Sequence, residues 1–122
     1  MDRIVRFHAG QVPAWDAIKS QLHRVGEPGT IRMIDGLPAF PDETPEPDWE
    51  ELRVAAGGAM VTLRREVDSL TCVVWGNADE ALVASWNRFL WACAAAGDGA
   101  VMTNAGAVSA STFAQLAEIR PA

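Results

Sequence analysis

The residues of this chain that could carry out chemistry are few and scattered. His8 and His23 are the only histidines, Lys19 is the only lysine, and the two cysteines, Cys72 and Cys93, do not form a CxxC pair. Neither histidine has ligand-like spacing to another His, Cys or carboxylate, and GxSxG, GxGxxG and GxxxxGK[ST] motifs are absent. The sequence therefore predicts no catalytic residue, no metal site and no cofactor.

The densest group of similar side chains is a run of carboxylates between Asp42 and Glu51, in a stretch rich in proline. It lacks the DxDxDG spacing of a calcium loop, and its stiff prolines oppose wrapping around an ion. We expect an extended acidic loop that binds a basic protein, because clustered charge raises association rates by about 10 to 10³. Tryptophan is common at interface hot spots, so the expected partner-binding residues are Asp42, Glu43, Glu46, Asp48, Trp49 and Trp75.

A three-strand meander over about residues 49–76 must position these groups. A turn at Gly57-Gly58 sets Glu51 opposite Arg64. That register also pairs Ala56 with Ala59, Val54 with Val61, Leu52 with Leu63 and Glu50 with Arg65. A second turn at Asp68-Ser69 pairs Val67 with Leu70, Leu63 with Val74 and Thr62 with Trp75. The expected inner face holds Leu52, Val54, Val61, Leu63, Leu70, Cys72 and Val74.

Helix and strand signals alternate along the rest of the chain. Apolar spacing and capping residues predict helices over about 13–25, 78–96 and 111–119, the second with Asn77 as N-cap and Gly97 at the C′ position. Short strands are expected over 3–9, 30–34 and 100–103. A chain of 122 residues with 49% hydrophobic content fits one domain, residues 1–122. The predicted fold class is α+β with a mostly antiparallel sheet.

Charge and hydropathy exclude some classes of function. The net charge of −6 opposes binding to nucleic-acid phosphates, so no nucleic-acid partner is expected. The most apolar predicted helix, over 78–96, contains Asp79, Glu80, Asn87 and Arg88 and is too polar to span a bilayer. With no signal-peptide pattern at Met1, we expect no membrane association and a cytoplasmic protein.

These observations favour a non-enzymatic, acidic protein-binding domain. In size and charge the chain resembles bacterial toxin-immunity proteins, a likeness of composition rather than of motif, which implies an antagonist of a basic toxin or effector. One alternative is a small ligand-binding protein or enzyme with a site near the first strand and first helix, using His8, His23 or Asp16. Another is a self-associating domain, a homodimer that buries an apolar outer sheet face formed by Met60, Val73 and Trp75.

Overall fold

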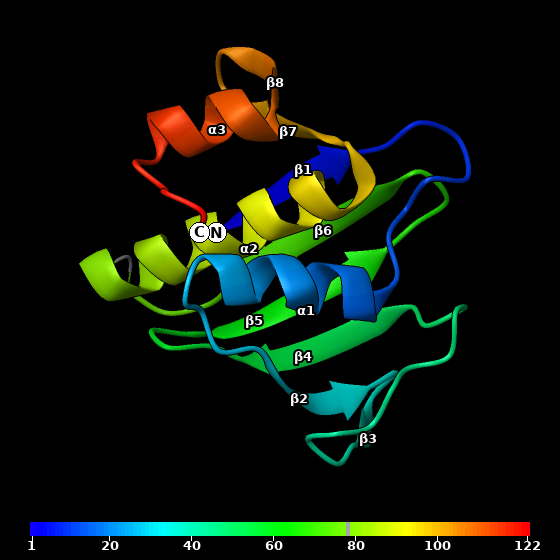
Figure 1. The fold of residues 1–122 in the computed structure, drawn as a ribbon. Helices are drawn as coiled ribbons and strands as arrows, with labels where there is room; N and C mark the ends of the chain where they lie inside the picture. Colours follow the sequence, from blue (N-terminus) through cyan, green and yellow to red (C-terminus); the bar gives the residue numbers. More distant parts are fainter. Residues whose placement is uncertain (78) are drawn as a thin grey trace.

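In the part of the chain that the structure describes, one antiparallel sheet of eight strands runs through the molecule, and three helices lie on one of its faces (Figure 1). The computed structural model describes residues 1–77 and 79–122. The strands are β1 (Asp2–Arg6), β2 (Thr30–Ile34), β3 (Leu37–Pro38), β4 (Glu51–Ala55), β5 (Met60–Arg65), β6 (Ser69–Val74), β7 (Ala100–Thr103) and β8 (Gly106–Ser109). The helices are α1 (Trp15–Arg24), α2 (Glu80–Gly97) and α3 (Ala110–Leu116). The predicted α+β class with an antiparallel sheet is confirmed.

The strand order is β3-β2-β4-β5-β6-β1-β7-β8, so the first strand of the chain lies deep inside the sheet. In β1, Val5 pairs with Leu70 of β6 on one side and with Val101 of β7 on the other. All three side chains are buried under the helices, as expected for apolar residues that alternate with polar ones on a half-covered sheet. β3 and β8 form the two edges.

The first predicted hairpin register is correct. Val54 lies opposite Val61 and Glu51 opposite Arg64, and the Glu51 carboxylate is 3.5 Å from the Arg64 Nε. The structure records a backbone hydrogen bond between Arg65 and Glu50, from the Arg65 N–H to the Glu50 carbonyl at 2.8 Å.

The second predicted register is wrong by two residues. Leu63 pairs with Cys72 rather than Val74, and Thr62 pairs with Val73 rather than Trp75. The Glu66 N–H donates to the Ser69 carbonyl at 2.9 Å, so the turn lies one residue earlier than the sequence suggested. Because the shift is even, every side chain remains on the face predicted for it.

The helix ends differ in detail from the predictions. Asp79, not Asn77, caps α2, because its carboxylate accepts a hydrogen bond from the Leu82 N–H at 2.8 Å. The predicted start at residue 78 lies outside the described residues. Gly97 is the last residue of α2, and Asp98 takes the left-handed conformation with φ 50°.

The remaining differences concern short elements. α1 begins two residues after the predicted start at residue 13, and α3 ends three residues before the predicted end at residue 119. β3 and β8 were not predicted, since the first lies in the proline-rich stretch and the second joins a strand to a helix.

The core lies between the sheet and the helix layer. Trp15 of α1 and Trp86 of α2 are buried, and the Trp86 Nε1 donates to the Cys72 carbonyl at 3.0 Å. Cys72, which was predicted to lie on the inner face, and Cys93 are both free and buried. Burial raises the pKa of the Cys93 thiol from about 9.0 to about 12 and raises that of Cys72 well above its ordinary value.

Candidate protein-binding surface

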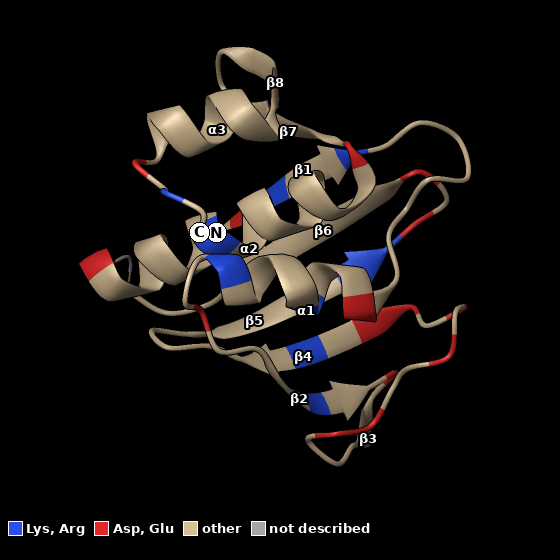
Figure 2. Ribbon diagram, viewed as in Figure 1, with Lys and Arg blue, Asp and Glu red and all other residues tan. Residues whose placement is uncertain are grey.

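Residues 37–51, called the acidic stretch from here on, form β3, the loop after it and the first residue of β4. They include six of the sixteen acidic residues and no basic one, so the ten acidic residues elsewhere balance the ten lysines and arginines. The whole net charge of −6 is therefore concentrated in fifteen residues. Figure 2 shows acidic segments gathered along β3 and the loop that follows it. The exposed carboxylates predicted to bind a partner are Asp42, Glu43, Glu46 and Asp48.

Hydrogen bonds hold this loop in a defined conformation. The Asp35 carboxylate accepts from the N–H groups of Glu50 and Glu51, both at 2.8 Å. A turn closes where the Glu43 N–H donates to the Phe40 carbonyl at 3.0 Å. The carboxylates are thus presented on an ordered backbone, which lowers the entropy lost when a partner binds.

Trp49 does not lie on the surface, and its predicted role as an interface anchor must be corrected. Its side chain is 2% exposed and belongs to the core. The Arg65 guanidinium lies 5.6 Å from the centre of its ring, and the Arg65 Nε donates to the Trp49 carbonyl at 2.8 Å. Trp49 therefore anchors the acidic stretch to the domain rather than to a partner.

Phe40 is the exposed aromatic residue of the acidic stretch, and it was not among the predicted partner-binding residues. Its side chain is 77% exposed, and Leu37 nearby is also strongly exposed. The sequence held a signal of this exposure, because Phe40 stands between Ala39 and Pro41 and belongs to no helical or alternating apolar pattern that would place it in the core. An aromatic side chain among carboxylates offers both apolar area and charge to a partner.

Trp75 lies elsewhere, just beyond the end of β6 on the sheet face opposite the helices. It is 57% exposed, and the Arg64 guanidinium lies 5.8 Å from its ring centre. Arg64 pairs with Thr71, and Trp75 lies four residues after Thr71 in the chain. At about 3.3 Å per residue, the backbone of Trp75 is therefore roughly 13 Å from that of Thr71. The four loop carboxylates are thus exposed on one loop, whereas Trp75 lies toward the other end of the strands, where it is linked to the acidic stretch through Arg64, the partner of Glu51.

The outer face near Trp75 is less apolar at its surface than its sequence suggests. Met60 is exposed, but Val73 is buried, although none of the helices lies on this side. Long side chains such as that of Arg64 cover apolar neighbours with their methylene groups. The predicted face of Met60, Val73 and Trp75 thus presents only two of its three side chains to solvent.

The residues of the alternative site are not brought together. His8 and His23 are exposed, and Asp16 and His23 lie in the first and last turns of α1. His8 borders a hollow of about 400 Å³ that also includes Arg6 and Asp98. Among the described residues, no group of three His, Cys, Asp or Glu side chains could hold a metal ion.

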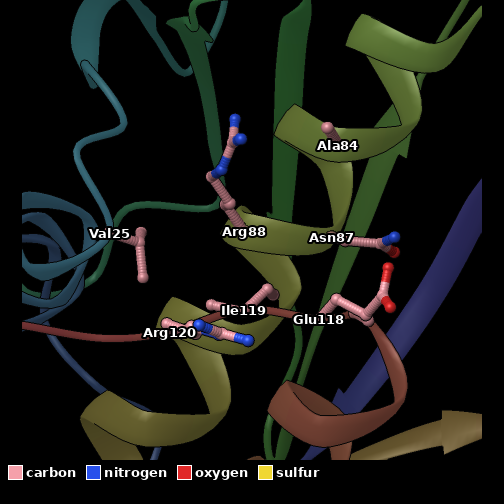
Figure 3. Close-up of a pocket in the computed structure, with 8 residues that line it drawn as sticks. Val25, Ala84, Asn87, Arg88, Glu118, Ile119 and Arg120 are labelled. Atoms are coloured by element: carbon pink, nitrogen blue, oxygen red, sulfur yellow. The ribbon is translucent and has the colours of Figure 1, made fainter.

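A second hollow, of about 210 Å³, lies between α2 and the segments that follow α1 and α3. Figure 3 shows Arg88 directed away from Arg120, and the Glu118 carboxylate directed toward Asn87. Arg88 is already paired with the buried Glu27 at 2.8 Å. The two guanidinium groups therefore do not converge on one ligand position.

Fold and surface together describe a one-sided α+β sheet domain with an ordered acidic loop. Comparison with protein-family models, with curated proteins and with solved structures finds no match for this chain. In the described part of the chain, no helix is both long and apolar enough to cross a membrane.

Proposed function

We propose that this chain is a non-enzymatic protein-binding domain whose acidic stretch binds a basic surface of a partner protein. One observation carries the proposal: the carboxylates that account for the net charge of the chain lie in the same fifteen-residue stretch as a strongly exposed phenylalanine, Phe40. The carboxylates accelerate association with a basic partner. Phe40 supplies apolar area, and burying a phenylalanine side chain is worth about 1.5 to 3 kcal/mol.

The form of this function that we propose is an immunity-type antagonist of a basic toxin or effector in the bacterial cytoplasm. An effector surface that binds an anionic substrate would attract the acidic stretch and be blocked by it. The two free, buried cysteines suit a reducing compartment. The ordered loop suits an inhibitor, because little conformational entropy remains to be lost on binding.

The test begins with capture of partners from the native lysate, elution with rising salt and identification of any basic protein released. Its affinity is then measured by calorimetry for the wild type and for a variant with Asp42, Glu43, Glu46 and Asp48 changed to lysine. We expect binding to weaken more than tenfold and to lose its salt dependence. Phe40→Ala should weaken binding by about 10- to 150-fold without changing the salt dependence.

Two matched controls separate these effects from general ones. Reversal of Asp16 and Glu80 to lysine, both exposed and outside the acidic stretch, gives half the change in net charge of the four reversals and leaves the site intact. Leu116→Ala removes an exposed apolar side chain far along the chain from Phe40. Affinities unchanged by the four reversals, or reduced equally by the controls, would refute the proposal.

A further inference from the structure

The strand β8 forms an open edge of the sheet. It is the last strand in the order, and among the described residues it pairs only with β7. Gly106, Ala107 and Ser109 are exposed, so the helices leave this edge accessible. Alternate residues of an edge strand direct their N–H and C=O groups outward, where they can pair with another strand.

The two edges of this sheet are built differently. β3, at the far edge, has two residues, one of them Pro38, and is followed by Pro41 and the carboxylates of the loop. Proline and charge are the usual devices that prevent a sheet edge from pairing with another chain. β8 has four residues, none of them charged and none of them proline. Only one edge is thus protected against strand addition.

The absence of charge extends well beyond β8. Residues 99–117, which include β7, β8 and α3, contain no Asp, Glu, Lys or Arg, although 21% of the chain is charged. Exposed surface in a domain of this composition normally carries charge. An uncharged segment at an unprotected edge has the character of a contact surface.

We propose that β8 pairs antiparallel with β8 of a second copy of this chain, across a two-fold axis. A strand edge is self-complementary under such an axis, because each copy offers the same donors and acceptors in reverse order. Two chains of net charge −6 would repel, but the acidic stretch follows the opposite edge. Seven strand spacings of about 4.8 Å place it roughly 34 Å from β8, several screening lengths away at physiological salt.

The contact between the two β8 strands is small, so the affinity of the dimer should be low. A strand of four residues buries less than the roughly 800 Å² per partner typical of stable complexes. We therefore expect a weak dimer that is largely dissociated at 10 µM and forms as the concentration approaches 1 mM. It joins two sheets into one continuous sheet and places one acidic stretch at each end. This inference does not rest on the proposed function.

Sedimentation velocity from 10 µM to 1 mM tests the pairing. The average mass of the wild type should rise from 13.1 kDa toward twice that value, and high salt should not lower it because the contact carries no charge. Ala107→Lys places an ammonium on each side of the axis and should keep the chain monomeric. Leu37→Lys at the opposite edge strand and Trp75→Ala on the outer face should dimerise like the wild type.

A second measurement on the unmodified chain covers the case in which Ala107→Lys fails to fold. Hydrogen exchange of the amides of residues 106–109 should slow as the concentration rises, while exchange in β3 stays constant. A wild type that remains monomeric at 1 mM would overturn the proposal. So would a folded Ala107→Lys that dimerises normally, or a dimer that only Trp75→Ala disrupts.

Discussion

Replacing Glu27 with alanine should destabilise the domain strongly, because three parts of the fold share this one carboxylate. Its Oε1 accepts hydrogen bonds from the Gly57 N–H and the Ser85 hydroxyl, each at 2.8 Å. Its Oε2 pairs with Arg88, also at 2.8 Å. The Ser85 oxygen in turn accepts from the Gly58 N–H at 2.9 Å, so the carboxylate links the β4–β5 turn to α2.

The size of the expected loss of stability in Glu27→Ala depends on how deeply the Glu27 carboxylate and its partners are buried. The Glu27 side chain is 2% exposed and that of Arg88 is 38% exposed, so water can replace the carboxylate around Arg88 but hardly around Ser85. The bond from the buried Ser85 hydroxyl, worth about 1.5 to 3 kcal/mol, is then lost without replacement, whereas the bond from the exposed Gly57 N–H is partly replaced by water. Relief from burying the carboxylate offsets part of this loss, which leaves about 3 kcal/mol of destabilisation.

Urea unfolding followed by tryptophan fluorescence measures this change. We expect the midpoint for Glu27→Ala to fall by about 1.5 to 2 M, for an m-value near 1.5 to 2 kcal/mol/M. Glu46→Ala, in the exposed loop, should change stability by less than about 0.5 kcal/mol. In the Glu27→Ala, Ser85→Ala double variant the two losses should be less than additive, because the residues share a bond. A loss below about 1 kcal/mol for Glu27→Ala would refute the reasoning.

Two further predictions concern packing and pH. A Cβ at Gly58 would overlap the Ala81 carbonyl oxygen, so Gly58→Ala should cost about 2 to 3 kcal/mol, whereas Gly57→Ala, with its nearest contact at 3.4 Å, should cost far less. Equal melting temperatures for these two variants would contradict this. Because burial raises the pKa of Cys93 to about 12, the unfolded chain releases this proton at lower pH than the folded chain. The free energy of unfolding should therefore fall between about pH 9 and 12, by up to about 1.4 kcal/mol per pH unit. The chain has no tyrosine and one lysine, and the buried Cys72 thiol contributes in the same direction, so Cys93→Ala should reduce this slope without abolishing it in denaturant titrations; an unchanged slope would contradict the prediction.

Local pairing was predictable from the sequence where two independent patterns agreed. At the β4–β5 hairpin, apolar alternation and the Glu51–Arg64 charge pair both required one register, and the structure has it. At the β5–β6 hairpin no charge pair distinguished registers two residues apart, so the turn was misplaced. β8 was missed because glycine, alanine and serine have little preference for strands. The insertion of β1 between β6 and β7 is a non-local pairing that leaves no local pattern.

The exposure of the carboxylates in the acidic stretch was predictable from the sequence, but the orientation of its aromatic residues was not. Trp49 stands among carboxylates in the sequence, yet the loop turns its ring into the core beneath Arg65. Phe40, without charged neighbours on either side, is directed into solvent. Which aromatic ring a loop buries depends on the space left under it by strands far along the chain, and that space has no signature in the neighbouring residues.

The central position of β1 also determines when the domain can form during synthesis. The ribosome makes β1 first, but both of its partner strands follow much later, and β7 ends only at Thr103. At about 5 to 20 residues per second, β1 must wait on the order of ten seconds before it can be fixed between them. During that interval the β4–β5–β6 meander can already pair with itself, with one lateral edge still open where β1 belongs. A nascent chain of this topology should therefore depend on holdase chaperones until its last strands leave the ribosome.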